Sequence, residues 1–397
     1  MAVKVIKKPI AISCHAQNSK LGVLGFKKIN KDTKEQVGFR GIRHLSEHLI
    51  CCAWDDMSEY FLRYGINHNA YTSNNHMTFY FQGLEKYVEK IVDDILLRKD
   101  KNMFDFIPNK DIYERELKVV MQEYEGYMSK PYNALSINLL RKYYRHSGPI
   151  GTYSDLQDMT YDKFIPFFME QKHFDEYIRV GEYNRNTDIA MLAHYDYSRY
   201  DNGYTKIESR RPYIEYKEDK VDIEYTGSSS GQTIIADWIQ YDETVEPWEA
   251  AMVSELLDGG VGSPLLKVLR EEHGLAYTAN LNVINPVVPA LISYVTVNPS
   301  NVDKARNLLH DTYINWEKYI TRDRFNSAIA GVHIQNELSA AKNYSIANIE
   351  KLHGEVGLYP TNNLVGTFTY ERACNILSKF FIKENIRIAQ VDKEIII

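Results

Sequence analysis

The sequence predicts an α+β protein made of two homologous domains, each with a mostly antiparallel sheet and helices packed on one face. The chain has 397 residues, and this length exceeds one ordinary core and suits two domains of about 200 residues each. Its 44% hydrophobic and 25% charged residues are typical of a soluble globular protein. The same order of strand and helix patterns occurs in both halves, although residue identity between the halves is low.

The first half begins with strand-like runs and then alternates helices and strands. In order, we expect strands at 11–13 and 21–26, a helix from about Ile42, a strand at 69–81, an amphipathic helix around 88–95 and a helix from Ile112 to about Tyr127. Within 69–81, the side chains of Tyr71, Met77, Phe79 and Phe81 occupy alternate positions. This period of two favours one long strand.

A polar stretch from Ser198 to Lys220 separates the halves and is the candidate linker. We therefore predict an N-terminal domain at 1–200, a linker at 201–220 and a C-terminal domain at 221–397. The second half is expected to contain a strand at 233–239, a helix at 247–257, a glycine turn followed by another helix, strands at 276–283 and 290–297, and an amphipathic helix around 302–309.

Charge and composition argue against several classes of function. The net charge is −6 and no long basic run occurs, so nucleic acid is not expected as the main partner. No segment approaches the roughly 18 apolar residues that a membrane span needs. The N-terminus lacks the apolar core of a signal peptide, so we expect a cytoplasmic protein. The four cysteines form no CxxC pair, and we expect them to be buried apolar side chains.

One short segment has the spacing of a metal site. His44 and His48 are four residues apart in a predicted helix, so both imidazoles project from one face and can supply two ligands of a tetrahedral zinc ion. Glu47 lies beside them and could accept a proton from an attacking water molecule. The alternative is a solvated helix face, because such a motif arises by chance in roughly a few per cent of chains of this size.

A third ligand must come from another element. On the helix from Ile112, the residues Glu116, Val119, Val120 and Glu123 fall at i, i+3, i+4 and i+7, so two acids share a face with two valines. Carboxylates on a core-facing side are costly unless they are paired or bind a metal. The alternative is a solvated stripe on a helix rich in charged residues.

These motifs resemble the pitrilysin and insulinase family of zinc metallopeptidases, and above all its half-length, processing-peptidase-like members. Residues 41–48 match the family's Gly-x-x-His-x-x-Glu-His helix. Residues 114–123 resemble the segment that supplies the third ligand, and Glu123 lies 75 positions after His48, close to the family spacing.

The resemblance implies a metal site with one zinc ion per chain. Its ligands would be His44, His48 and Glu123. Glu47 would be the general base, and Glu116 would support the site by orienting a ligating histidine.

Residues 69–72 resemble the family's Asn-Ala-x-Thr strand. This implies a sheet edge beside the zinc, to which a peptide substrate adds as an extra strand. Asn69, Ala70 and Tyr71 are therefore candidate substrate-binding residues. Asn69 could also be an ordinary residue at the start of a strand.

Two segments of the second half, 256–265 and 269–277, resemble the family's Gly-Gly-x-x-Ser-x-Leu and Leu-Arg-Glu-x-x-Gly-Leu-Ala-Tyr motifs. By this resemblance, Arg270 and Tyr277 would bind the substrate carbonyl and stabilise the oxyanion. A buried Arg/Glu pair and a strand tyrosine are the alternative. The glycines could suggest a phosphate loop, but no Gly-Lys-Ser/Thr follows, and a helix C-cap with a tight turn is the simpler role.

Two further segments bear on the site. Residues 146–151 are similar to a family segment and are expected to form a turn instead of supplying a ligand. The resemblance departs at 51–56, where Cys51-Cys52-Ala53-Trp54-Asp55-Asp56 replaces the usual Phe-x-Gly-Thr. The pocket and the cleavage preference therefore stay open.

Taken as a whole, the resemblance implies a zinc metalloendopeptidase that cleaves short or unfolded peptides. Its two α/β-roll domains would form half of a clamshell, and two chains would enclose a chamber. We expect a homodimer, because one chain carries both the zinc motif and the Arg270/Tyr277 segment. The alternatives are the active half of a heterodimer, a non-catalytic peptide-binding or scaffold member, and a nucleic-acid or tyrosine-rich binding module that binds no metal.

Overall fold

The computed structural model describes residues 3–6, 11–14, 21–30, 35–74, 76–96, 105–144, 147–172, 174–180, 220–222, 233–241, 244–258, 260, 262–285, 288–341 and 362–391. The described residues form two compact units. The first contains those up to Gly126 and those at 147–180, and the second contains those at 127–144 and from 220 onward. Of the predicted linker at 201–220, only Lys220 is described, and it begins a strand.

A six-stranded sheet forms the centre of the first unit. Its strands are β1 (Val3–Ile6), β2 (Ala11–Cys14), β3 (Leu21–Ile29), β4 (Asn67–Thr72), β5 (His76–Leu84) and β6 (Glu176–Val180). They lie in the order β1-β2-β6-β3-β5-β4, and neighbours are antiparallel except for β2 and β6. One edge of the sheet is therefore β4.

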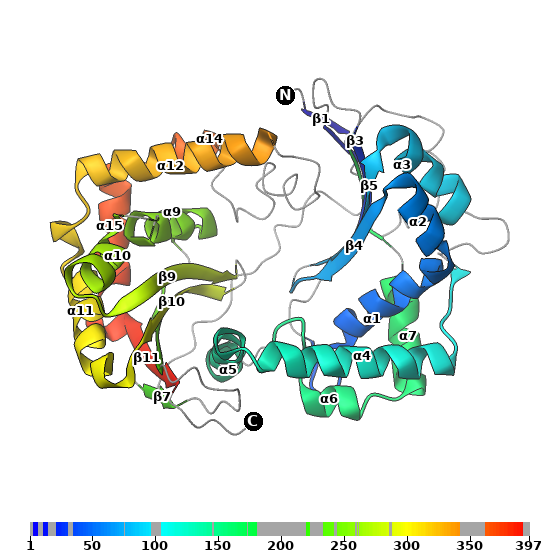
Figure 1. Cartoon of the computed structure of the whole chain (residues 1–397), viewed down its shortest axis with the longest axis horizontal. Coiled ribbons are helices and arrows are strands. Elements are labelled where there is room, and N and C mark those ends of the chain that lie inside the picture. Colours follow the sequence, from blue (N-terminus) through cyan, green and yellow to red (C-terminus); the bar gives the residue numbers. More distant parts are fainter. Residues whose placement is uncertain are drawn as a thin grey trace. The chain divides into compact units, whose positions relative to one another are not determined.

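Helices pack against this sheet, and Figure 1 shows α1, α2 and α3 on the same side of it. Their bounds are α1 (Ile42–Cys51), α2 (Ser58–Tyr64), α3 (Glu85–Ile91), α4 (Lys110–Met128), α6 (Tyr153–Gln157) and α7 (Tyr161–Gln171), with single helical turns η1 (Cys52–Met57) and η2 (Val92–Leu96). The ring of Trp54 in η1 lies 6.1 Å from that of Phe79 and 5.4 Å from that of Phe81, measured between centroids. The segment after α1 is thus held on the sheet by aromatic packing.

The second unit has a five-stranded sheet. Its strands are β7 (Lys220–Asp222), β8 (Thr233–Gln240), β9 (Ala276–Asn285), β10 (Val288–Val297) and β11 (Ile386–Val391). The order is β7-β11-β8-β10-β9, and only β7 and β11 are parallel. The edge strand β9 therefore corresponds in position to β4 of the first sheet.

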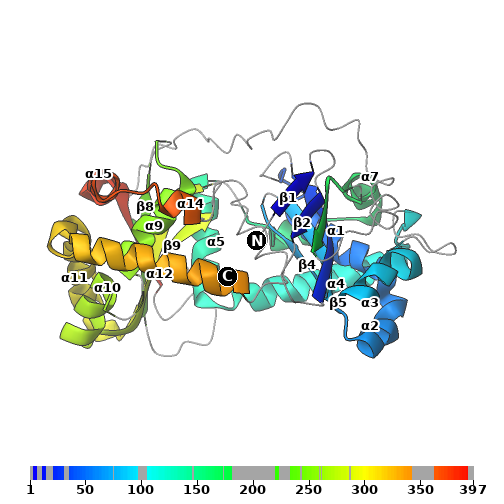
Figure 2. The same ribbon diagram turned by 90° about the horizontal axis from the view of Figure 1, so that it is seen from above.

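The helices of the second unit include α5, which precedes α6 in the chain but groups with the second sheet. Their bounds are α5 (Pro131–Tyr144), α9 (Pro247–Asp258), α10 (Pro264–Leu266), α11 (Val302–Ile314), α12 (Arg322–Ala341), α14 (Asn362–Val365) and α15 (Tyr370–Phe380), with turns η5 (Lys267–Glu272), η6 (Pro299–Asn301), η7 (Trp316–Lys318) and η9 (Lys383–Asn385). Figure 2 shows α12 extending along α9 and α14. None of the described helices is long and apolar enough to cross a membrane.

The two units repeat one topology. The series β2-β6-β3-β5-β4 and β7-β11-β8-β10-β9 have the same chain order and the same strand directions. In chain order, the second of these five strands is β3 in the first unit and β8 in the second, and each is followed by a helix, α1 after β3 and α9 after β8. The predicted fold class, with two similar α+β units and mostly antiparallel sheets, is confirmed.

One predicted element is wrong. The strand expected at 69–81 is the hairpin of β4 and β5, with a turn between Ser73 and His76, where the N–H of Ser73 donates to the His76 carbonyl at 2.8 Å. The register pairs Tyr71 with Thr78, so Tyr71 lies on the opposite face from Met77, Phe79 and Phe81. Odd-numbered positions therefore change face at the turn, and the alternate spacing of Tyr71 and Met77 in the sequence did not reveal it.

The N-terminus of α1 is fixed by two carboxylates. Glu35 accepts hydrogen bonds from the backbone N–H groups of Gly41 at 2.5 Å and Arg43 at 3.0 Å. Asp155 accepts from the backbone N–H and from the guanidinium of Arg40, the latter at 2.7 and 3.0 Å. Because the first turn of a helix leaves its N–H groups without helical partners, these contacts fix where α1 begins.

A glycine contact brings the same end of α1 against a neighbouring turn. The turn expected at 146–151 is confirmed for its described part, where the N–H of Gly151 donates to the Gly148 carbonyl at 3.3 Å. A Cβ atom on Gly151 would lie 2.4 Å from the backbone nitrogen and Cα of Gly41. The φ angle of Gly151 is +75°, which only glycine adopts readily.

Gly151→Ala should therefore lower the free energy of unfolding by at least about 2 kcal/mol, because the left-handed conformation alone costs alanine roughly 1–2 kcal/mol and the backbone contact adds to it. Urea unfolding followed by circular dichroism measures the change. The matched control is Gly126→Ala, in the last turn of α4, where a Cβ meets nothing within 4 Å. That change should stabilise the protein by about 0.5–1 kcal/mol. Equal effects at both positions would contradict the close contact.

Candidate metal centre

The burial of one face of α1 presents two histidines side by side. Leu45 and Leu49 are fully buried, and each follows a histidine in the sequence. Residues four apart share a helix face, so His44 and His48 also project together. Their ring centroids are 4.9 Å apart, and their side chains are 15% and 16% exposed.

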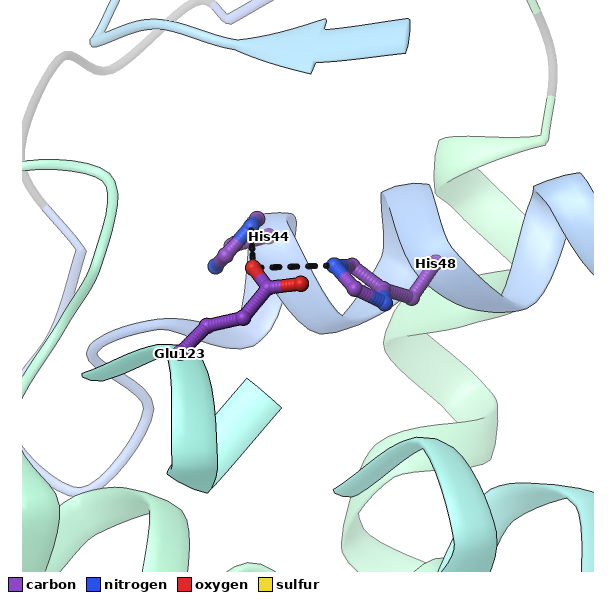
Figure 3. A group of neighbouring side chains, drawn as sticks. All are labelled: His44, His48 and Glu123. Atoms are coloured by element: carbon purple, nitrogen blue, oxygen red, sulfur yellow. Dashed lines mark ion pairs between the residues drawn. The ribbon is translucent and has the colours of Figure 1, made fainter. Parts of the chain in front are cut away.

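Glu123 of α4 completes a group of three side chains that could hold a metal ion (Figure 3). Its Oε2 lies 3.4 Å from Nε2 of His44 and 3.5 Å from Nε2 of His48. Neighbouring ligands of a tetrahedral zinc ion with bonds of about 2.0–2.1 Å are about 3.3 Å apart. Both distances from Glu123 match this value, the three ligand atoms lie within 4.8 Å of one another, and no second group of this kind occurs among the described residues.

Glu116 fixes the orientation of one imidazole. Its Oε2 lies 3.3 Å from Nδ1 of His48. A carboxylate at this nitrogen favours the tautomer with hydrogen on Nδ1, which leaves the lone pair of Nε2 directed at Glu123. The structure thus contains a contact between Glu116 and His48, while the support of a metal ligand by Glu116 stays a prediction.

The electrostatics of α1 favour neutral imidazole at His44. Burial, with a smaller contribution from the neighbouring His48, lowers the pKa of His44 to about 4. Because a histidine binds metal through a neutral ring nitrogen, His44 is ready to ligate at neutral pH without losing a proton.

Glu47 has a hydrogen-bond partner that sequence reasoning did not select. It is only 8% exposed, and burial raises the pKa of its carboxyl, while a hydrogen bond from Thr72 lowers it. The Thr72 hydroxyl donates to Oε2 of Glu47 at 2.5 Å. The signal was present, because Thr72 is the last residue of the 69–72 motif, but only a structure shows that its side chain reaches α1.

The candidate substrate-binding residues lie on the edge strand β4. Asn69 is exposed, and its Oδ1 accepts a hydrogen bond from the N–H of Ala70 at 2.8 Å. The ring of Tyr71 contacts that of His76 with centroids 5.6 Å apart. Among the described strands, β4 pairs with β5 alone and is the edge of the sheet, the position at which a peptide strand can add.

The candidate oxyanion residues lie together in the second unit. The guanidinium of Arg270 stacks over the ring of Tyr277, 4.8 Å from its centroid. Tyr277 is 77% exposed, and Arg270 is exposed as well. This differs from the alternative of a buried Arg/Glu pair, and both side chains are free to contact a ligand.

Residues 32–151, which contain His44, His48, Glu123 and β4, match the sequence profile of insulinase, peptidase family M16. This segment belongs to the insulinase family. The expected resemblance is confirmed, and the match stops short of the Arg270/Tyr277 segment. No curated protein matches the chain in sequence.

Solved structures extend the likeness in fold to the whole chain. A protease from Helicobacter pylori superposes with a TM-score of 0.77 at 16% identity, over 99% of both chains. A structure described as a peptidase M16 inactive domain from Pseudomonas fluorescens gives 0.69 at 14% identity, over 98% of both. Pitrilysin gives 0.70 at 15% identity, over 99% of this chain and 45% of its own length. At these identities the likeness establishes the fold alone.

The segment that departs from the family pattern contains two free cysteines, Cys51 and Cys52. Burial raises the pKa of Cys51 well above its ordinary value and that of Cys52 to about 12. Both thiols therefore stay protonated at neutral pH. Cys52 is buried as expected, whereas Cys51 and Cys374 are only half-buried.

The Glu47–Thr72 contact predicts a difference between two threonine substitutions in the metal-free protein. Thr72→Val removes the donor to a buried carboxylate and should lower the free energy of unfolding by about 1–3 kcal/mol at neutral pH. Thr72→Ser keeps a hydroxyl and should lower the free energy of unfolding by a smaller amount. Urea unfolding across a pH series measures both.

The sign of the pH effect follows from Glu47. Losing the donor raises the folded-state pKa of Glu47 further. The loss of unfolding free energy in Thr72→Val is therefore largest at a pH where the Glu47 carboxyl is ionised, and it becomes smaller as pH falls and the carboxyl is protonated. A serine variant as unstable as the valine variant would show that the hydroxyl contributes nothing.

Proposed function

We propose that this protein is a zinc-dependent endopeptidase that hydrolyses short or unfolded peptides. The observation that carries the proposal is the grouping of His44, His48 and Glu123: the Glu123 carboxylate lies 3.4 and 3.5 Å from the two imidazoles, which are the separations of neighbouring ligands in a tetrahedral zinc site. It is supported by the insulinase-family match of the segment that holds all three.

The three side chains would hold the metal, with Glu116 keeping His48 in its ligating orientation. Bound zinc supplies a Lewis acid that polarises the scissile carbonyl and lowers the pKa of the attacking water towards about 7. Glu123 is 48% exposed at its side chain, so the cluster is open to solvent on that side. A substrate and a water molecule could both enter there.

Glu47 would move the protons. Its carboxylate would take a proton from the attacking water and pass it to the leaving amine. Burial raises its pKa, and a general base acts best when its pKa is near the working pH. The hydroxyl of Thr72 holds one oxygen and leaves the other available to the water.

The edge strand β4 would hold the peptide. Backbone hydrogen bonds to Asn69, Ala70 and Tyr71 would align an extended chain as an added strand without requiring a fixed sequence. Such binding needs an unfolded segment, because a folded partner has its backbone groups already paired.

Arg270 and Tyr277 would stabilise the carbonyl oxygen as it gains charge. We propose that they act on the zinc site of a second chain, so that a homodimer contains two composite sites. This rests on the resemblance of 269–277 to a family segment and on the exposure of the stacked pair. A heterodimer would use the same residues with a different partner.

A non-catalytic role is the second candidate, because one structural neighbour is described as an inactive domain. The complete set of ligands and the buried Glu47 favour catalysis over that role.

Metal removal tests the proposal directly. Chelation should abolish cleavage of a fluorogenic peptide library, and one equivalent of zinc per chain should restore it. His48→Ala should lose both zinc and activity. Elemental analysis and peptide cleavage measure the two properties in the same samples.

The matched control is Glu47→Gln, which should keep zinc but lower kcat by orders of magnitude, since the amide cannot accept the proton. Full zinc occupancy and activity in His48→Ala would contradict the ligand assignment. A wild-type kcat in Glu47→Gln would remove Glu47 as the general base.

Mixed dimers test whether each site is shared between two chains. Glu47→Gln and Arg270→Ala should each be nearly inactive alone. After subunit exchange in equal amounts, half of the dimers are mixed and half of their sites are intact, so activity should recover to roughly a quarter of wild type.

The comparison requires proof that subunits have exchanged, which differently tagged chains provide. An exchanged mixture as inactive as its components would mean that the two motifs act within one chain or that Arg270 has no part in catalysis.

A further inference from the structure

The side chain of Arg115, next to Glu116 on α4, joins two parts of the first unit. Its Nε donates to Oε1 of Glu116 at 2.8 Å. Its Nη2 donates to Oδ2 of Asp55 at 3.0 Å and to the sulfur of Cys52 at 3.3 Å. One guanidinium therefore holds α4 to the helical turn η1 that follows α1.

This contact accounts for both oxygens of Glu116. Oε1 accepts from Arg115, and Oε2 lies 3.3 Å from Nδ1 of His48. The terminal torsion of a glutamate is broad, so a carboxylate held at one oxygen alone could rotate away from the histidine. Held at both oxygens, it has one orientation.

The partners of Arg115 come from the segment that departs from the family pattern. An exposed arginine loses up to about 2 kcal/mol of rotamer entropy when it is fixed, so it needs more than one partner to stay in place. Asp55 and Cys52 supply these partners, and the Cys52 thiol in turn donates to the carbonyl of His48 at 3.4 Å. A chain of contacts thus begins and ends at His48.

We infer that Arg115, anchored by Asp55 and Cys52, is a positioning residue that holds Glu116 against His48 and so sets the affinity of the site for zinc. The inference rests on the proposed zinc site. Simple electrostatics predicts the opposite sign, because a guanidinium near a divalent cation repels it and its removal would tighten binding. An effect of Arg115 through the position of Glu116 can therefore be distinguished from an effect of its charge by the direction in which zinc affinity changes.

The zinc dissociation constant tests the inference, measured for the full chain by competition with a fluorescent chelator. Arg115→Gln should weaken zinc binding about 10-fold, the lower end of the effect of removing a group that orients a ligand. Arg115→Lys keeps the charge but cannot hold Glu116 and Asp55 together, so it should also weaken binding, though less. The control is Lys110→Gln, an exposed cation on the same helix whose partner Glu114 is 3.8 Å away, which should leave binding unchanged.

A double-substitution cycle separates positioning from a general structural effect. If Arg115 acts through Glu116, then Arg115→Gln should add no further loss in a Glu116→Gln protein. Circular dichroism of the metal-free variants should match wild type, and their thermal midpoint should fall only slightly, since the side chain of Arg115 is 55% exposed.

Unchanged or tighter zinc binding in both Arg115 variants would overturn the inference, as would full additivity with Glu116→Gln. Those results leave the proposed function standing, because the wild type still binds zinc. A wild-type chain that binds no zinc would overturn the proposed function and this inference with it.

Discussion

The position of α1 relative to α4 is the constraint on which the site depends. The candidate ligand atoms on the two helices lie 3.4 and 3.5 Å apart, and moving one helix by a single residue along its axis would displace them by about 1.5 Å. The fully buried Leu45 and Leu49 hold α1 in the core. The carboxylates of Glu35 and Asp155 fix where it starts. The candidate metal site therefore depends on where α1 and α4 lie relative to each other.

The repeated topology shows how one framework carries different chemistry. In the first unit, Glu47 of α1 reaches the side chain of Thr72 on the edge strand β4. In the second, Ser254 and Asp258 of α9 bond to the backbone of Leu281 on the edge strand β9, the N–H donating to Asp258 at 2.8 Å. In both units, therefore, the helix after the second strand contacts the edge strand. In the first unit the contact holds the buried carboxylate of Glu47, and in the second it holds the backbone of β9. Duplicated folds can diverge in this way because function resides in side chains.

The hydrogen bond between the adjacent residues Arg115 and Glu116 depends on the residues of η1 that surround it. Neighbouring helical residues do not ordinarily face each other, yet Arg115 and Glu116 are bonded at 2.8 Å. Asp55 and Cys52 draw the guanidinium across the helix surface towards η1. The segment at 51–56, which differs from the family pattern, thereby connects to the ligand His48 through Glu116.

The sequence alone determined the features that follow from regular residue spacing and from the repeated order of elements. Spacing of four predicted that His44 and His48 share a face, and the recurring order of elements predicted two similar α+β units. Glu123 could be assigned only through a family resemblance, since nothing in local periodicity specifies a partner 75 residues from His48. The hairpin within 69–81, the hydroxyl of Thr72 at Glu47 and the contacts of Arg115 were decided by tertiary structure. Periodicity records which face a side chain occupies, whereas a turn or a hydrogen bond depends on which other element packs there.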